Sequence, residues 1–225
     1  MALCQVLDLN PYEKGGIAAY AHVRGGGENG EEWYRARFQQ TKPNTWKDFI
    51  ACAEYLIEQK YSSPAKLAGE GPSAGGITIG KAITERSDLF AVPIPRVGLM
   101  NPVRLETTPN GVPNIPEFGS CQTEAGFKAL YEMDAYLHVK DGMNYPAMLI
   151  TQGMNDPRIE PWQSMKFAAC VQAASYSWGR SVLLRIDYEA GHGNESTKTQ
   201  LVQQRADIFS FMMWQFGMEN YSNPM

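Results

Sequence analysis

The chain has 225 residues, of which 44% are hydrophobic and 20% are charged, as expected of a globular protein long enough to bury its own core. Its formal net charge of −4 provides no basic field, which argues against nucleic acid and against an anionic membrane surface as partners. No apolar run is long enough to span a bilayer, and the N-terminal segment "MALCQVLDLN" lacks the features of a secretory signal.

The cysteines indicate a reducing compartment. They lie far apart, without C-x-x-C spacing, at Cys4, Cys52, Cys121 and Cys170. Free thiols are the better interpretation, although an even number also permits disulfides. We therefore expect a cytoplasmic protein, and its length favours a single domain over residues 1–225.

Short apolar runs alternate along the chain with helical patterns. Strands are expected at 16–23, 66–70, 90–100, 145–153 and 181–188. Helices are expected at 45–60, 75–86, 125–137, 161–174 and 197–216, with a long loop at 101–125. Thr45 and Asp48 form a capping-box pattern at the start of the first of these helices. The alternation predicts a mostly parallel sheet covered by helices on both faces.

A first glycine motif raises the question of a dinucleotide. Gly25, Gly27 and Gly30 fit G-x-G-x-x-G after a predicted strand, with Asp48 where a ribose-binding acid is sought. Such a site needs a helix that begins inside the glycines, so that its amides meet the pyrophosphate. Here the glycines lead into "EEWYRARF", whose two carboxylates would repel phosphate. Asp48 also suits the first turn of a helix without any ligand.

A second motif, Gly75–Lys81, fits most of a phosphate-binding loop, G-x-x-x-x-G-K. Ala82 follows Lys81, so the hydroxyl that would hold Mg²⁺ is missing. The residues between the two glycines are mostly apolar and suit a buried helix. A nucleotide-binding protein is therefore the least favoured hypothesis, and we expect neither a cofactor nor a metal.

The segment "GPSAG" supports a different chemistry. Gly71-Pro72-Ser73-Ala74-Gly75 fits G-x-S-x-G, the strand-to-helix turn that exposes a nucleophilic serine. The turn is tight, so the neighbouring residues must be small, and here they are. The following helix would direct free amides, that of Ala74 first, at a developing oxyanion. The motif alone also fits a flexible glycine–serine turn. Whether Ser73 is a nucleophile therefore depends on whether the chain also supplies a base and an acid for it.

A nucleophilic serine needs a base, and the chain has 3 histidines. His22 lies within a strand pattern and His138 follows a helical pattern, so structural roles are expected for both. His192 lies between glycines in "AGHGN", just after the last predicted strand. In an open parallel sheet the carboxyl ends of the strands carry the catalytic loops. His192 is therefore the candidate base.

The acid that orients this histidine is expected at another strand end. Asp156, in "QGMNDPR" after the fourth predicted strand, fits that place. Asp187 competes but lies within a predicted strand, and Glu160 is a weaker alternative. The order Ser73, Asp156, His192 is that of α/β-hydrolases.

Together these segments resemble the catalytic domain of the prolyl oligopeptidase family of serine peptidases. "VRGGGENGEEWY" is similar to its glycine-rich segment, "GPSAGG" to its nucleophile turn, "NDPRIEPWQSMKF" to its acid loop and "AGHG" to its histidine loop. The resemblance covers nearly all of the chain. It implies an α/β-hydrolase fold with Ser73 as nucleophile, Asp156 as acid and His192 as base. It also implies that Arg158 binds a backbone carbonyl of the substrate, although Arg158 fits a surface salt bridge equally well.

The sequence also departs from this family. Full members carry an N-terminal β-propeller, for which this chain has no counterpart. The family strand that precedes "GGIAAYAHV", with a tyrosine that donates to the oxyanion, has no match in "MALCQVLDLNPYEK". Either residues 2–8 fill its place near the middle of the sheet, or the sheet is rearranged, or another subunit completes it. Ala129 stands where the family has the tryptophan that stacks on proline.

We therefore expect a compact serine hydrolase that acts through an acyl-enzyme. With Ala74 as the one assignable oxyanion donor, small carboxylic esters are the expected substrates, since an ester is easier to cleave than an amide. The alternatives are a serine peptidase acting on short peptides and a catalytically impaired paralogue that serves as a binding module. Exposed strand edges are usually covered, so a homo-oligomer is expected.

Overall fold

The computed structural model describes residues 3–7, 15–175, 178–193, 196–219 and 221. The strands in these ranges are β1 (Leu3–Leu7), β2 (Ala18–His22), β3 (Ala68–Pro72), β4 (Val92–Arg96), β5 (Met148–Gly153) and β6 (Val182–Asp187). The α-helices are α1 (Glu31–Arg35), α2 (Pro43–Glu58), α3 (Gly75–Glu85), α4 (Ile115–Phe118), α5 (Glu124–Glu132), α6 (Pro161–Ala174) and α7 (Lys198–Gln215). Short 3₁₀ turns lie at Gln39–Thr41, Pro64–Lys66, Ser87–Leu89, Pro102–Thr107, Val112–Asn114 and Tyr136–His138.

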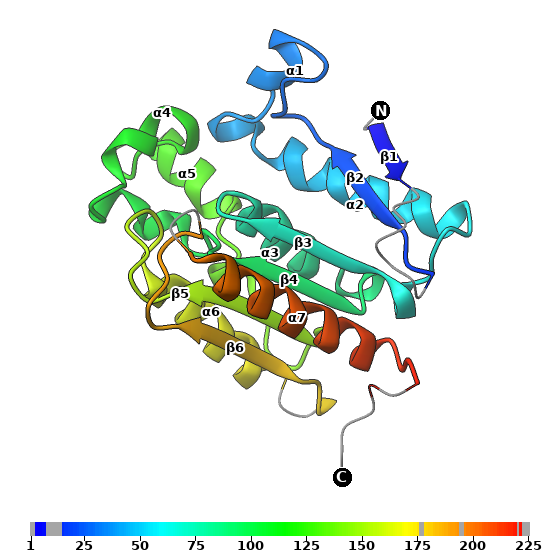
Figure 1. Ribbon diagram of the computed structural model, residues 1–225. Helices are drawn as coiled ribbons and strands as arrows, with labels where there is room; N and C mark the ends of the chain where they lie inside the picture. Colours follow the sequence, from blue (N-terminus) through cyan, green and yellow to red (C-terminus); the bar gives the residue numbers. More distant parts are fainter. Residues whose placement is uncertain (1–2, 8–14, 176–177, 194–195, 220, 222–225) are drawn as a thin grey trace.

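The main sheet contains parallel strands in the order β3–β4–β5–β6. Helical segments return the chain to the opposite end of the sheet after each strand, so strands that follow one another along the chain become neighbours. The carboxyl ends of these strands therefore lie at one edge of the sheet (Figure 1). The predicted parallel, helix-covered sheet is confirmed.

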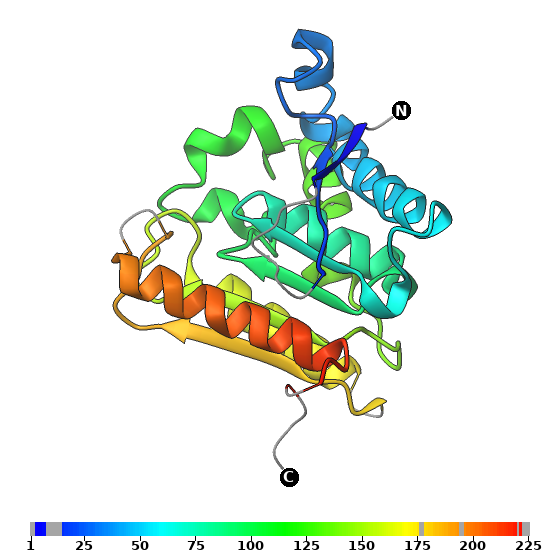
Figure 2. The same cartoon turned by 45° about the vertical axis from the view of Figure 1, so that its right-hand side comes forward.

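Alternate positions of the central strands serve two separate cores, because successive side chains of a strand point to opposite faces. On one face, Ile94 of β4 and Leu149 of β5 belong to a buried cluster with Phe211 of α7. On the other face, where α3 and α6 contact the sheet, Met148 and Ile150 of β5 join the larger core. Figure 1 shows α7 in front of the sheet with α3 and α6 behind it, and Figure 2 shows the same layers from the side.

β1 and β2 form a separate antiparallel pair, with Leu3 opposite His22 and Leu7 opposite Ala18. Among the described residues, no strand is hydrogen-bonded to the second edge of β3. Of the three alternatives for the missing strand, the one in which residues 2–8 fill its place in the main sheet is wrong for residues 3–7, because these pair with β2 and form no ladder with β3.

The start of α2 differs from the expectation. The helix begins at Pro43, whose fixed φ suits a first helical position, and no side chain caps it. The predicted capping box at Thr45 and Asp48 is therefore wrong. Thr45 Oγ1 donates instead to the Arg24 carbonyl at 3.0 Å, and Asp48 accepts three hydrogen bonds from the backbone N and guanidinium of Arg24, at 2.9, 2.8 and 2.6 Å. These side chains fasten the segment after β2 to α2.

The segment 101–125 contains more regular structure than the expected long loop. Its turns Pro102–Thr107 and Val112–Asn114 and the helix α4 each have a proline at one of their first two positions. Proline is tolerated at the first positions of a helical turn, because the N–H that it lacks would have no partner within the turn. The prolines of this segment therefore begin helical turns, although in the sequence they indicated a loop.

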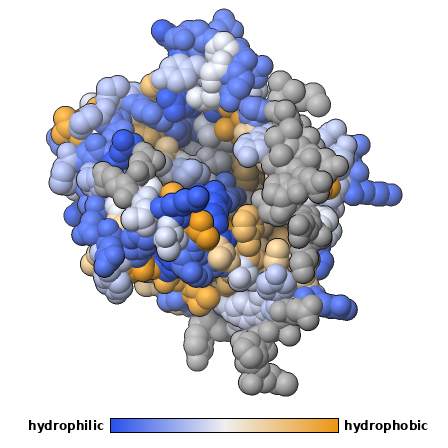
Figure 3. Space-filling model, in the orientation of Figure 1, coloured by the Kyte–Doolittle hydropathy of each residue, from blue (hydrophilic) through white to orange (hydrophobic). Residues whose placement is uncertain are grey.

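The surface in the orientation of Figure 1 is hydrophilic over most of its area, with hydrophobic residues in small groups at the centre and toward the edges (Figure 3). The large exposed side chains, such as Tyr188 and Val112, come from segments far apart in the chain. Scattered exposure of this kind needs no partner to explain it. In the described part of the chain, no helix combines the length and the apolar composition needed to cross a membrane.

Candidate active site

Ser73 occupies the turn between β3 and α3, as the G-x-S-x-G motif predicts. Its φ is +56°, a left-handed conformation that residues other than glycine rarely adopt. Ser73 N donates to the Arg96 carbonyl at 2.9 Å, and Leu99 N donates to the Ser73 carbonyl at 3.0 Å. Strand β4 and the loop after it therefore hold Ser73 at the carboxyl edge of the sheet, in a conformation that costs on the order of 1–3 kcal/mol.

Glycines make this turn possible. A Cβ on Gly71 would lie 2.5 Å from the Gly75 carbonyl oxygen, and a Cβ on Gly76 would lie 2.5 Å from the Gly98 Cα. Both distances are shorter than any van der Waals contact, so a larger residue would push α3 away from β3 or from the loop after β4. Gly71 and Gly76 are thus required by the packing around the serine, whereas a Cβ on Gly75 would meet only the Pro72 Cδ, at 3.4 Å.

Asp187, at the end of β6, shapes the histidine loop. Its Oδ1 accepts hydrogen bonds from the backbone N atoms of Glu189 and Ala190, both at 3.1 Å. The loop after β5 is tied to the same turn, because Met154 N donates to the Asp187 carbonyl at 2.8 Å and Asn155 N donates to the Ala190 carbonyl at 3.0 Å. The loops after β5 and β6 therefore form one connected unit.

This unit brings Asp156 and His192 to Ser73. The His192 Nε2 lies 3.0 Å from the Ser73 Oγ, and its Nδ1 lies 2.8 Å from Asp156 Oδ2 and 3.0 Å from Oδ1. The side chain of His192 is 10% exposed and that of Asp156 is 0% exposed. The imidazole thus links the serine hydroxyl to a buried carboxylate, the arrangement in which a histidine can serve as a base toward serine.

The environment of Asp156 favours its ionised form. Burial raises the pKa of this carboxyl, but hydrogen bonds from His192 and from the backbone N atoms of Ile159 (3.0 Å) and Arg158 (2.9 Å) outweigh burial and hold the pKa below its usual value. An ionised carboxylate can only accept, so the Nδ1 of His192 donates to it and the Nε2 is left to accept from Ser73.

The competing acids do not take this place. Asp187 is engaged with its own turn, and Glu160 lies directly before α6. Among the described contacts, the carboxylate bound to His192 is that of Asp156.

The other two histidines lie away from Ser73, as expected. The His138 Nδ1 lies 2.7 Å from the Asp134 carbonyl oxygen, and the His22 Nδ1 lies 3.1 Å from Glu28 Oε1. Both rings are held by neighbours close in sequence.

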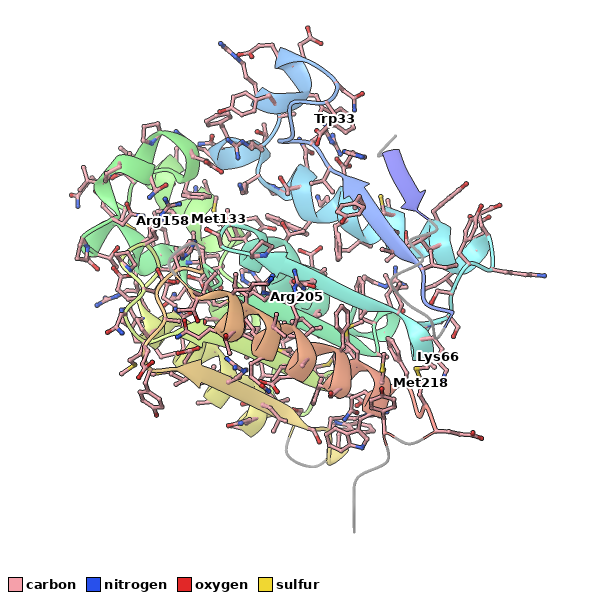
Figure 4. All side chains as sticks on the ribbon, viewed as in Figure 1. Trp33, Lys66, Met133, Arg158, Arg205 and Met218 are labelled. Carbon is pink, nitrogen blue, oxygen red and sulfur yellow. The ribbon has the colours of Figure 1, made fainter. Side chains whose placement is uncertain are left out.

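Ala74 and Arg158 flank this group of side chains. Ala74 is the residue before α3 and follows Ser73 directly, and the first amides of a helix have no partner within the helix. Arg158 is exposed on the loop after β5 (Figure 4), where its carbonyl accepts a hydrogen bond from Asn110 Nδ2 at 3.2 Å. No acidic residue in the described ranges forms an ion pair with its guanidinium.

Neither glycine motif is arranged as a phosphate site. Helix α1 begins only after Gly30 and has two glutamates in its first turn. Lys81 is 1% exposed, and its Nζ lies 3.4 Å from Glu85 Oε1 and 5.4 Å from the centre of the Trp46 ring. The described residues contain no group of three His, Cys, Asp or Glu side chains that could hold a metal ion.

Two residues at the end of β5 were not expected to matter. A Cβ on Gly153 would lie 2.1 Å from the Gly191 carbonyl oxygen, so a glycine lets the histidine loop approach the strand. Gln152 is 1% exposed, and its Nε2 lies 3.1 Å from Asp156 Oδ2. The signal in the sequence was a polar residue and a glycine that end the apolar run "AMLITQG", because a buried amide needs hydrogen-bond partners.

A parallel sheet that carries a serine on a tight turn, a histidine and a buried carboxylate at one edge has the architecture of the α/β-hydrolases. The model of the prolyl oligopeptidase family matches residues 5–219. The chain therefore belongs to the prolyl oligopeptidase family of serine peptidases, as the motifs predicted.

Individual relatives agree with this assignment. The prolyl endopeptidase of Elizabethkingia miricola is 35% identical over 209 residues, which cover 92% of this chain and 30% of that protein. A solved structure from an analysis of two prolyl endopeptidases has a TM-score of 0.88 and 36% identity, and the match covers 91% of this chain and 30% of that one. Prolyl oligopeptidase B of Galerina marginata, solved with a 35mer hydrolysis and macrocyclization substrate, has a TM-score of 0.86 and 32% identity, with 91% and 29% covered. The chain spans about 30% of the length of these relatives.

The comparisons favour a different substrate from the one expected. These relatives are named as peptidases, so the peptidase alternative is better supported than small esters. Ala129, where a specificity tryptophan was expected, is 4% exposed within α5 and belongs to the core.

Proposed function

We propose that this chain is a serine peptidase unit that hydrolyses peptide bonds through an acyl-enzyme, with Ser73 as nucleophile, His192 as base and Asp156 as orienting acid. The observation that carries the proposal is the contact of Ser73 with His192, and of His192 with the buried Asp156, at hydrogen-bond distances. Peptides that contain proline are the first candidate substrates, because the relatives are named prolyl endopeptidases and prolyl oligopeptidases.

The proton inventory of the reaction follows from the contacts of His192. As the Ser73 oxygen bonds to the peptide carbonyl carbon, His192 Nε2 takes the hydroxyl proton, and the ionised Asp156 stabilises the resulting imidazolium. The imidazolium then gives this proton to the departing amine as the carbon–nitrogen bond breaks. In the second half, water gives a proton to His192 and its oxygen bonds to the acyl carbon. The proton returns to Ser73 as the acid product leaves.

Ala74 and Arg158 would hold the substrate. The amide of Ala74 lies at the start of α3, where the helix dipole also favours negative charge, and it would donate to the oxyanion of the tetrahedral intermediate. Arg158, exposed and without an ion-pair partner in the described ranges, would donate to a backbone carbonyl of the peptide. A peptide offers such a carbonyl and a small ester does not.

Turnover of matched substrates tests the proposal. We expect the protein to hydrolyse a prolyl-peptide p-nitroanilide, and we expect Ser73→Ala to abolish the reaction while Ser210→Ala, an exposed position on α7, leaves it unchanged. Turnover of p-nitrophenyl butyrate without turnover of the peptide would assign the site to small esters instead. A folded protein that cleaves neither substrate would favour a binding module without catalysis.

A further inference from the structure

Gln152 is a buried polar residue to which the catalytic proposal gives no role. It is the last residue but one of β5, a strand whose residues are all buried, and it is 1% exposed. A buried amide costs free energy unless its hydrogen-bonding groups are paired. Its position in the chain places it at the base of the loop that carries Asp156.

The amide nitrogen of Gln152 binds this loop from the inside. Its Nε2 lies 3.1 Å from Asp156 Oδ2, 3.2 Å from the Gly153 carbonyl oxygen and 3.2 Å from the Ile159 carbonyl oxygen. One NH₂ group therefore contacts the loop at its beginning, at the carboxylate and near its end. These contacts link the shape of the loop to the direction of the carboxylate.

Ser164 fixes the orientation of the amide. The Ser164 Oγ, on α6, is fully buried and donates to Gln152 Oε1 at 2.7 Å. A flipped amide would turn its oxygen toward three acceptors, among them the Asp156 carboxylate, which would be repulsive. The hydrogen bonds thus run in one direction, from Ser164 to Gln152 and from Gln152 to Asp156.

The donors around Asp156 show what Gln152 adds. Its Oδ1 accepts from the backbone N atoms of Arg158 and Ile159, whereas the described donors to its Oδ2 are His192 at 2.8 Å and Gln152 at 3.1 Å. Without Gln152, the oxygen nearest His192 would have no second donor to hold it.

We propose that Gln152, held by Ser164, is a positioning residue that fixes Asp156 Oδ2 toward His192. This inference rests on the proposed function, because the direction of Asp156 matters only if His192 acts as the base. It gives the peptidase site a support that reaches from the sheet into α6.

The rate at which a fluorophosphonate modifies Ser73 provides the test, because that reaction needs the base but no particular peptide. Gln152→Met keeps the side-chain length and removes the donor, and we expect it to slow labelling about tenfold, the loss that corresponds to a hydrogen bond to a charged group. Ser164→Ala keeps the amide but releases it, and we expect a smaller loss. This second variant keeps the test valid if Gln152→Met does not fold.

The pH dependence of labelling separates positioning from packing. Gln152→Glu preserves size but brings a second carboxylate to Asp156. Arg158 and Glu160 follow Asp156 along its own loop, and Asp187 ends the neighbouring strand β6. Among the described contacts, the titratable side chain that reaches the Asp156 carboxylate is that of His192. Two carboxylates about 3 Å apart do not both ionise, so this pair holds one proton between them. Loss of that proton as the pH rises removes the donor to Asp156 and leaves two repelling charges, so we expect the labelling rate of this variant to fall with pH above the ascending limb, where the wild-type rate does not fall.

Gln172→Glu is the matched control. Gln172 is exposed on the same helix as Ser164, and its Nε2 donates to the Val182 carbonyl at 2.7 Å, so the substitution makes the same chemical change away from Asp156. It should leave the wild-type pH profile unchanged.

Two results would overturn the inference. One is an unchanged labelling rate in both Gln152→Met and Ser164→Ala. The other is a loss in Gln152→Met while Gln152→Glu keeps the wild-type pH profile, which would give the residue a packing role only. Failure of the proposed function would look different: an inactive site would leave wild-type Ser73 unlabelled, and an ester-specific site would label normally but not turn over the prolyl-peptide substrate.

Discussion

The carbonyl oxygen of Gly191 lies so close to Gly153 that a methyl group added to Gly153 would be 2.1 Å from it. The same methyl would be 2.6 Å from the carbonyl oxygen of Ala190. The end of β5 and the histidine loop after β6 are thus so close at this point that there is no room for a side chain between their backbones. Gly191 directly precedes His192, so this contact lies next to the residue that reaches Ser73.

Gly153→Ala should therefore displace the histidine loop. We expect the rate of Ser73 labelling to fall on the order of 100-fold, because a displacement of about 1 Å in a reacting group has that effect. Gly27→Ala is the control, since a Cβ there meets nothing within 4 Å and the backbone lies outside the left-handed region. Wild-type labelling by Gly153→Ala would show that the loop adapts, contrary to this account.

Lys81→Met should leave stability nearly unchanged. Burial lowers the pKa of Lys81, and the nearby Glu85 only partly offsets burial. Glu85 is 34% exposed and also accepts from the Trp46 Nε1 at 2.8 Å, so it is not left as an unpaired buried charge. We expect the free energy of unfolding in urea to change by less than about 1 kcal/mol or to rise. Lys47→Met, at an exposed site on α2, is the control, and a loss above about 3 kcal/mol in Lys81→Met alone would contradict this interpretation.

The contribution of Asp156 to stability should depend on pH. Its pKa in the folded protein is lowered, so the folded state favours the ionised carboxylate. The stabilisation is then present above the unfolded-state value of about 3.9 and is lost as the pH falls through the lower folded-state value. Urea unfolding of wild type and Asp156→Asn should differ at pH 7, and the difference should narrow below about pH 4. A difference that stays constant to the lowest measurable pH would rule out this sign.

Arg158→Ala should weaken peptide hydrolysis selectively. We expect kcat/KM for the prolyl-peptide substrate to fall about 10- to 100-fold, the effect of losing a hydrogen bond to a charged donor, while labelling by a small fluorophosphonate stays unchanged. Arg180→Ala is the control, because Arg180 is exposed and precedes β6, at the opposite end of the sheet. Equal losses in peptide turnover and in labelling would assign Arg158 to the structure of the acid loop.

The sequence predicted the architecture and the candidate site because both depend on local patterns. Helix α6 (Pro161–Ala174) coincides with the expected 161–174, and the four strands of the main sheet lie within or close to their expected ranges. Ser73, Asp156 and His192 each follow a predicted strand of a parallel sheet. Such a sheet gathers strand ends at one edge whatever the details of packing.

Contacts between distant segments could not be predicted in the same way. Thr45 and Asp48 do not form the predicted capping box, because both side chains form hydrogen bonds with Arg24 instead. Arg24 lies 21 residues before Thr45 and 24 residues before Asp48. Residues 3–7 likewise pair with β2 and not with β3. Their local sequence does not show which of these two strand edges they bind. The cytoplasmic location and the self-association expected from the sequence stay predictions.

Mass spectrometry of the protein after treatment with a fluorophosphonate tests the central claim most directly. We expect one covalent adduct on Ser73, which is absent in Ser73→Ala and forms more slowly in His192→Ala. A folded wild-type protein without an adduct at Ser73, or with one at another serine that His192→Ala does not affect, would contradict it.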